Sequence, residues 1–247
     1  SNDLEIYDNI PELLSVSLGS AETTLLSLTS AYATFVNGGK KIKPILVEKI
    51  QDRRGKTIFN FDQRECIGCD RISEDKNIFP SIKNNHKQVI SEETAYQVTS
   101  ILEGVIKRGT GKKLRDLKVP LAGKTGTTNE NYDAWFIGFT SNLVIGVYIG
   151  FDTPQTLGRY ETGSKAALPI FKSFIKKALY KDDFKKFKIP GNIYFSAINY
   201  DTGKPEDFDN PKAIIEAFKL EDIKKMKNNN LSITSNYDRL IKFRQFY

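Results

Sequence analysis

The stretch Gly123-Lys124-Thr125-Gly126-Thr127-Thr128 decides how the rest of this 247-residue chain is interpreted. It combines an ammonium group, hydroxyls and a glycine on a short, apolar-flanked segment that is typical of a strand. Hydroxyl and ammonium groups can hold an anion, and a glycine lets another backbone approach closely. The stretch therefore predicts an anion-binding strand, and the rest of its site is expected on neighbouring elements.

Short apolar runs around this stretch indicate a sheet, because no helical pattern separates them. We expect strands at residues 117–128, 134–140 and 143–151. The link Ser141-Asn142 is short enough for an antiparallel hairpin between the last two strands. Strands that follow one another directly, with helices before and after, predict an α+β fold with a mainly antiparallel sheet flanked by helices.

Three helices are expected, because apolar residues recur at three- and four-residue spacing in three segments. The first is capped by Thr23 or Thr24 and ends at Asn37-Gly38-Gly39, and the second is capped by Ser91. The third begins after Gly163-Ser164 and tolerates a proline in its first turn. The residues expected to be buried are Leu25, Leu28, Ala31, Tyr32, Phe35 and Val36 in the first helix, Ala95, Val98, Ile101, Leu102, Val105 and Ile106 in the second, and Ile170, Phe171, Phe174, Ile175, Ala178 and Leu179 in the third.

The segments before the second helix carry weaker signals. Residues 1–20 favour a short helical turn. Residues 40–62 favour a hairpin around the turn Asp52-Arg53-Arg54-Gly55, because two runs rich in β-branched and aromatic residues flank it. Residues 63–90 lack periodicity and predict a surface loop.

The composition changes after Phe187. A strand is expected at residues 193–198 and a turn at Asp201-Thr202-Gly203, and a segment rich in Lys and Asn follows. The sequence therefore predicts a main unit at residues 1–187 and a peripheral appendage at residues 188–247.

The net charge of +7 suggests an anionic partner. The lysines of residues 172–188 and 219–227 alternate with apolar positions, which is typical of solvated helix faces, and attraction to an anionic lipid or polymer stays open. No nucleic-acid motif accompanies them, so no nucleic-acid partner is expected. The longest nearly apolar run, residues 143–151, is far shorter than the roughly 18 to 20 residues that cross a bilayer. Acidic residues within residues 1–14 argue against a signal peptide there.

The two cysteines form one close pair, Cys66-Ile67-Gly68-Cys69. A structural zinc site usually needs four ligands, and the single histidine, His86, leaves the set short. A disulfide between Cys66 and Cys69 is favoured if the chain lies outside the cytosol. Free thiols and a metal site remain as alternatives.

Several ordered motifs around the opening stretch resemble the transpeptidase domain of class A, bifunctional penicillin-binding proteins. They follow that family's order over roughly residues 7–205, and an ordered set is far more specific than a lone K-T-G. The resemblance implies the α+β fold of penicillin-binding transpeptidases and serine β-lactamases. The motifs are Ser17-Leu18-Gly19, Ala31-Tyr32-Ala33, Asn37-Gly38-Gly39, Arg108-Gly109-Thr110, Gly123 to Asn129, Asp133 to Thr140, Gly146 to Asp152 and Ala166 to Phe171.

By this resemblance, the K-T-G strand supplies both catalytic and binding groups. Lys124 is expected to order the proton network and supply positive potential, and the Thr127 backbone N–H to donate to the developing oxyanion. The Thr125 and Thr127 hydroxyls would hold the carboxylate of the substrate or drug, and Gly126 would leave room for the substrate backbone. Thr110 also counts as a binding residue, although a Gly-Thr-Gly that ends a helix explains it without function.

The family's other site motifs, S-x-x-K with the nucleophilic serine and S-x-N, are not expected in this chain. Ser73-Glu74-Asp75-Lys76 and Ser173-Phe174-Ile175-Lys176 match S-x-x-K only as text. The first lies in an aperiodic segment, and the second on a packed helix after K-T-G. The chain is therefore expected to be the C-terminal part of an incomplete transpeptidase domain, inactive alone, with the N-terminal remainder of that domain as its partner.

The resemblance implies a serine acyl transferase that cross-links D-Ala-D-Ala-terminated peptidoglycan stem peptides and that β-lactam antibiotics block. It implies no cofactor and no metal. It also implies a location on the periplasmic side of the bacterial inner membrane, with the anchor outside this chain. A β-lactamase or β-lactam sensor of the same fold and a non-catalytic structural piece are the alternatives, although the segment after K-T-G is long for a compact β-lactamase.

Overall fold

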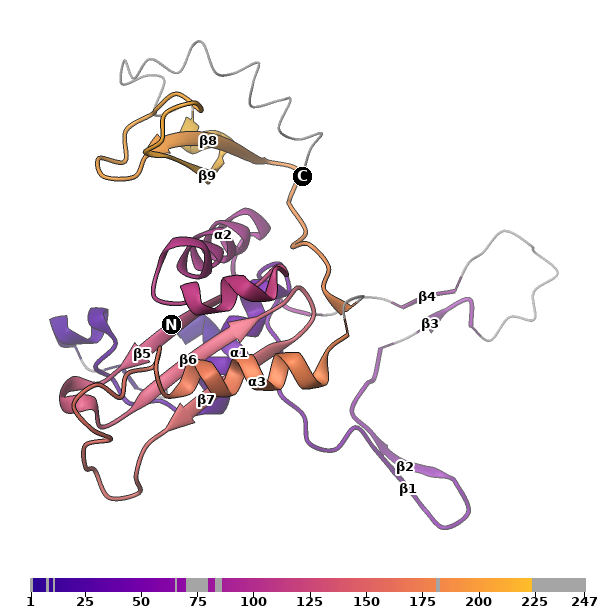
Figure 1. The fold of residues 1–247 in the computed structure, drawn as a ribbon. Coiled ribbons are helices and arrows are strands. Elements are labelled where there is room, and N and C mark those ends of the chain that lie inside the picture. Colours follow the sequence, from indigo (N-terminus) through magenta and orange to yellow (C-terminus); the bar gives the residue numbers. More distant parts are fainter. Residues whose placement is uncertain are drawn as a thin grey trace.

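A three-stranded antiparallel sheet in the order β5-β6-β7 lies at the centre of the protein (Figure 1). Its strands are β5 (Ala122–Thr127), β6 (Ala134–Phe139) and β7 (Val144–Ile149). With helices on its faces, this sheet confirms the predicted α+β fold. The computed structural model describes residues 2–7, 9–10, 12–64, 66–69, 80–82, 86–180 and 183–223.

The register of the sheet decides which side chains share a face. Lys124 pairs with Ile137, and Ile137 pairs with Gly146, so these three form one row across the strands. The next row contains Thr125 and Phe136 and points to the opposite face, because side chains alternate along a strand. The lysine and the first threonine of K-T-G therefore leave β5 on opposite faces.

The first strand begins later than predicted. The prediction of a strand at 117–128 was wrong at its start, because the 3-10 helix η3 (Lys112–Leu117) reaches into that range. Lys118 ends the helix in the left-handed conformation, with φ of 52°. Leu114 of η3 is buried in the core at 1% exposure, so tertiary packing outweighs the strand preference of this segment.

Helices cover both faces of the sheet (Figure 1). The helices α1 (Leu25–Val36) and α2 (Glu92–Arg108) pack on the face of Lys124, and α3 (Ala167–Ala178) packs on the face of Phe136. Thr24 caps α1 by accepting a hydrogen bond from the Ser27 N–H at 3.1 Å. Ser91 caps α2 in the same way, as predicted, accepting from the Thr94 N–H at 3.2 Å.

The predicted buried stripes are correct only in part. Ile101 of α2 is 59% exposed, and Ile170, Phe174 and Ala178 of α3 are also exposed, so these four predictions were wrong. On α2 the buried side chains instead include Tyr96 and Thr99. Tyr96 is buried because a C-terminal hairpin covers that side of the helix, and the apolar period of the helix alone does not reveal such a neighbour.

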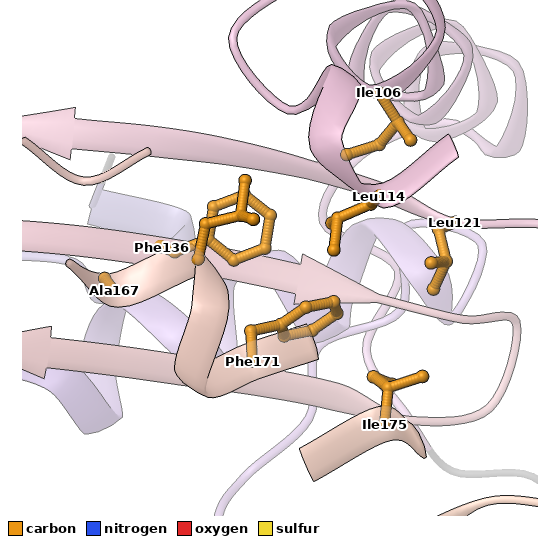
Figure 2. Packing of buried hydrophobic residues seen from close by; sticks show 8 residues of the cluster. Ile106, Leu114, Leu121, Phe136, Ala167, Phe171 and Ile175 are labelled. Atoms are coloured by element: carbon orange, nitrogen blue, oxygen red, sulfur yellow. The ribbon is translucent and has the colours of Figure 1, made fainter. Parts of the chain in front are cut away.

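One aromatic pair holds α3 on the sheet. The rings of Phe136 and Phe171 meet edge to face, with centroids 4.9 Å apart. Gly138 makes room for them, since an added Cβ would lie 2.5 Å from the Phe171 ring. Figure 2 shows this cluster, whose buried members are Ile106, Leu114, Leu121, Phe136, Ala167, Leu168, Phe171 and Ile175.

Short elements fill the N-terminal part. The predicted helical turn within residues 1–20 is present as η1 (Asn2–Leu4) and η2 (Leu14–Leu18). The predicted hairpin is present as β1 (Lys49–Gln51) and β2 (Thr57–Asn60), and both strands are exposed along their length. Its turn forms as expected, because Asp52 Oδ1 accepts hydrogen bonds from two backbone N–H groups and Gly55 adopts φ of 81°.

The segment 63–90 is not only loop, contrary to the prediction. Within its described residues, β3 (Cys66–Ile67) pairs antiparallel with β4 (Ser81–Ile82). Cys66 and Cys69 are joined by a disulfide, and their Cα atoms are 5.6 Å apart. The bond therefore staples the turn that follows β3.

We expect thiol titration of the unreduced, denatured protein to find no free thiol, because both cysteines of the chain lie in this bond. Reduction should release two thiols. A Cys66→Ser, Cys69→Ser variant should lose no more than about 2 kcal/mol of stability, since a disulfide stabilises least when the loop it closes is short. Two titratable thiols before reduction would contradict the pairing.

The C-terminal segment forms a hairpin of β8 (Ile193–Asn199) and β9 (Ala213–Lys219) that packs on α2 (Figure 1). The predicted strand 193–198 is confirmed. The second strand was missed, because it begins inside the segment assigned to the Lys- and Asn-rich tail. Among the described residues, no helix is both long and apolar enough to cross a membrane.

Candidate active site

The K-T-G strand β5 presents its backbone at an edge of the sheet. The Thr128 N–H donates to the Asp133 carbonyl at 3.2 Å, so the backbone groups of residue 128 point toward β6. Antiparallel strands alternate between inward and outward backbone groups. Thr125 and Thr127 are therefore outward positions, and the Thr127 N–H faces the open edge, as its predicted role of oxyanion donor requires.

Side chains of the predicted site residues gather along this edge. Lys124 Nζ donates to the Thr125 carbonyl at 2.9 Å, which is an outward-facing backbone acceptor. The hydroxyls of Thr125 and Thr110 share a hydrogen bond of 2.8 Å. The structure thus brings Lys124, Thr125, Thr127 and Thr110 together, with Thr110 supplied by the segment that follows α2.

Gly163 supports the strand from the α3 side. Its N–H donates to Thr127 Oγ1 at 3.1 Å. A Cβ at this position would lie 2.4 Å from the Trp135 carbonyl and 2.5 Å from the Gly126 carbonyl, so only glycine fits without displacing the backbone. The sequence indicated Gly163 only as the start of a helix. Its close approach to the K-T-G strand was missed, because nothing local to residue 163 signals it.

An aromatic row lies beside the strand on the face of Lys124. Gly126 pairs with Trp135, and Trp135 pairs with Tyr148 across β6 and β7. The Trp135 and Tyr148 rings are 4.7 Å apart, and the Tyr148 hydroxyl donates to Asp133 Oδ1 at 2.8 Å. This hydrogen bond to Asp133 raises the pKa of Tyr148, so its hydroxyl stays protonated at neutral pH. Trp135 is half-buried, with its ring against Tyr148 and not deep in the core.

Lys124 to Thr127 of β5, with Thr110 beside them, form one open side of the candidate site, which we call the K-T-G wall. Lys124, Thr127 and Thr110 are exposed, while Thr125 and Gly126 are half-buried. The hollow of about 360 Å³ between α1 and the β6–β7 turn does not include them. The Lys124 ammonium group, the threonine hydroxyls and the outward Thr127 N–H can together hold an anion at this edge. Among the described residues, no nucleophile that could react with a bound substrate lies beside them.

The two S-x-x-K matches do not complete this wall. Ser173 and Lys176 are exposed on α3, on the opposite face of the sheet from Lys124. The other match, residues 73–76, lies outside the described residues. No nucleophile of that pattern therefore reaches β5 from the described part of the chain.

An edge strand with K-T-G, on an antiparallel sheet covered by helices, defines the class of the penicillin-binding serine acyl transferases and β-lactamases. The comparisons with known proteins select within this class. The penicillin binding protein transpeptidase domain family matches residues 8–176, and the chain belongs to that family.

Relatives of known name agree with this assignment. The chain is 44% identical over 221 residues to penicillin-binding protein 1A of Rickettsia prowazekii, covering 88% of this chain and 27% of that protein. It is 33% identical over 245 residues to the protein of the same name from Pseudomonas aeruginosa, covering 87% of this chain and 30% of that protein. The chain thus spans less than a third of the length of these curated relatives.

Solved structures show the same fold. The crystal structure of penicillin-binding protein 1A from Haemophilus influenzae superposes with a TM-score of 0.72 at 32% identity, covering 89% of this chain and 35% of that one. The penicillin-binding protein PonA1 from Mycobacterium tuberculosis gives a TM-score of 0.58 at 25% identity, covering 74% and 45%. In both cases the chain corresponds to part of a longer protein.

Proposed function

We propose that this chain supplies the K-T-G wall of a penicillin-binding D,D-transpeptidase, which cross-links peptidoglycan stem peptides through a serine acyl-enzyme. The observation that carries the proposal is the open edge of β5. The Thr127 N–H and the Lys124 ammonium group lie at this exposed edge, and the half-buried Thr125 hydroxyl stands beside it, bonded to Thr110. A D-Ala-D-Ala terminus carries both groups that this surface fits, a carboxylate and a carbonyl that becomes an oxyanion.

The chemistry assigns a separate task to each group. A serine oxygen attacks the carbonyl between the two alanines, its proton passes to the leaving amine, and the last alanine departs. The Thr127 N–H stabilises the negative charge on the carbonyl oxygen as it forms. The Thr125 and Thr127 hydroxyls hold the terminal carboxylate, Lys124 supplies positive potential and orders the proton network, and Gly126 lets the peptide backbone lie along the edge. The amine of a second stem peptide then takes the acyl group and frees the serine.

The serine itself belongs to the part of the protein outside this chain, so the isolated chain is inactive. The N-terminal remainder of the transpeptidase domain is therefore its first partner. Residues 1–187 form the C-terminal part of that domain, and residues 188–247 a unit attached to it. β-Lactam antibiotics bind the same wall, and the site works on the periplasmic side of the bacterial inner membrane, where peptidoglycan strands are cross-linked.

A fluorescent penicillin tests the assignment. The full-length protein should become covalently labelled, because its serine and this wall act together, and the isolated chain should stay unlabelled at the same concentration. Mass spectrometry of both samples measures the adduct. A stoichiometric adduct on the isolated chain would overturn the placement of the nucleophile. Rapid hydrolysis of a chromogenic cephalosporin by the full-length protein would point to a β-lactamase instead.

A further inference from the structure

The β8–β9 hairpin packs against α2 through β9. Near the start of the helix, Asn192 Nδ2 donates to Glu93 Oε1 at 3.3 Å. Further along, the rings of Tyr96 and Phe195 are 6.2 Å apart. At the end of the helix, the Arg108 guanidinium pairs with the Glu216 carboxylate of β9. The hairpin therefore holds both ends of α2.

The Arg108–Glu216 pair also packs against the backbone of α2. Arg108 folds back over Gly104, where an added Cβ would lie 2.7 Å from Nη2 of the guanidinium. Glycine inside a helix costs about 1 kcal/mol relative to alanine, so its presence at this buried position has a packing reason. The side chain of Glu216 is only 14% exposed and that of Arg108 30% exposed. The pair thus lies partly covered between the helix backbone and β9.

Arg108 stands directly before the segment that reaches the K-T-G strand. The N–H groups of Gly109 and Gly111 both donate to the Val105 carbonyl, at 3.1 and 3.0 Å, and so end the helix. Thr110 lies between these two glycines. Its hydroxyl meets the Thr125 hydroxyl at 2.8 Å. The position of the helix end therefore determines where Thr110 stands against β5.

We propose that Glu216 and Arg108 are positioning residues of the transpeptidase site: through this pair the β8–β9 hairpin holds the end of α2, and so fixes Thr110 against the carboxylate-binding Thr125. This inference rests on the proposed function. It changes the role of the C-terminal unit from a peripheral appendage to a support of the K-T-G strand.

The electrostatics of Glu216 and Arg108 indicate that the pair fixes the position of the helix end and adds little to the stability of the fold. Burial raises the pKa of the Glu216 carboxyl, although the charges of Arg108 and Lys107 act to lower it. The loss of hydration thus exceeds the attraction within the pair. Partly buried ion pairs of this kind add little net stability, whereas a guanidinium and a carboxylate constrain orientation strongly.

The test compares variants of the full-length protein by their second-order rate constant of acylation with a fluorescent penicillin. Glu216→Gln keeps the shape and removes the charge, and we expect it to slow acylation about tenfold, because small displacements in a site reduce rates steeply. Arg108→Lys should act in the same direction, since it loses the planar fork. Asp201→Asn is the matched control. Asp201 lies on the same hairpin in an exposed pair with Lys212, so this variant should acylate like the wild type.

Combining Glu216→Gln with a substitution of Thr110 distinguishes a positioning role from a general loss of structure. Thr110→Val should itself slow acylation. In that background Glu216→Gln should add less than about a twofold loss, because the two changes act on one contact. The melting temperature, measured on the same samples, should respond to Glu216→Gln equally in both backgrounds. If the two rate losses multiply, or if only the melting temperature changes, the pair is merely structural and the inference is wrong.

A parallel measurement of Lys124→Ala keeps the two proposals apart. If Lys124→Ala leaves acylation unchanged, the proposed function of the strand fails. If Lys124→Ala slows acylation but Glu216→Gln and Arg108→Lys do not, the strand keeps its function and only the role of the hairpin is refuted.

Discussion

Replacing Lys124 by alanine in the full-length protein should slow acylation by penicillin about a hundredfold, the scale expected when a group that organises proton transfer is removed. Lys124 is exposed on β5, and its ammonium group lies at the outward edge, bonded to the Thr125 carbonyl at 2.9 Å. Alanine removes the only side-chain cation within the K-T-G strand and leaves the backbone N–H of Thr127 in place. The measurement is the rate of covalent labelling over a range of fluorescent penicillin concentrations.

The matched control is Lys212→Ala, which changes the net charge equally. Lys212 belongs to the loop between β8 and β9, is 67% exposed and pairs with Asp201 at 2.8 Å. Its loss should leave the labelling rate within about twofold, since exposed pairs contribute little. The assigned role of Lys124 is lost if both variants label at the wild-type rate. Equal slowing of both variants would indicate a general effect of charge and not a local one.

The largest loss of stability is expected for Phe171→Ala. Phe171 is fully buried between α3 and the sheet, where its ring meets Phe136 (Figure 2). The ring also covers Gly138. Removing such a ring costs roughly 3 to 5 kcal/mol, because the cavity does not collapse completely. At about 2 to 4 °C per kcal/mol for a unit of this size, the midpoint should fall by roughly 10 °C. Heating the full-length protein before penicillin labelling gives that midpoint for the transpeptidase domain.

Phe174→Ala provides the control on the same helix. Phe174 is 48% exposed although the helical pattern marked it as buried, so its removal should lower the midpoint by no more than a few degrees. A loss for Phe174→Ala that equals the loss for Phe171→Ala would show that this face of α3 is covered in the full-length protein. In that case the exposed side chains of α3 form an interface with the rest of the protein.

Local patterns in the sequence predicted much of the fold correctly. Ser91 and Thr24 cap their helices as expected, because a cap involves only residues three positions apart. The strands 134–140 and 143–151 differ from β6 and β7 by one or two residues at their ends. Errors arose where a distant neighbour decided the outcome. Tyr96 is buried by β8 and β9, and Leu114 draws the segment before β5 into the core as a helical turn.

By itself, the sequence determined the type of site. The residues that define it, Lys124 to Thr127, are consecutive, and alternation along one strand already separates their faces. Only the tertiary structure decided what supports them. Thr110 meets Thr125 across 15 positions, Gly163 meets Thr127 across 36, and Arg108 meets Glu216 across 108. Such contacts form when whole elements pack together, and because no local spacing encodes them, they can be identified only once the chain is folded.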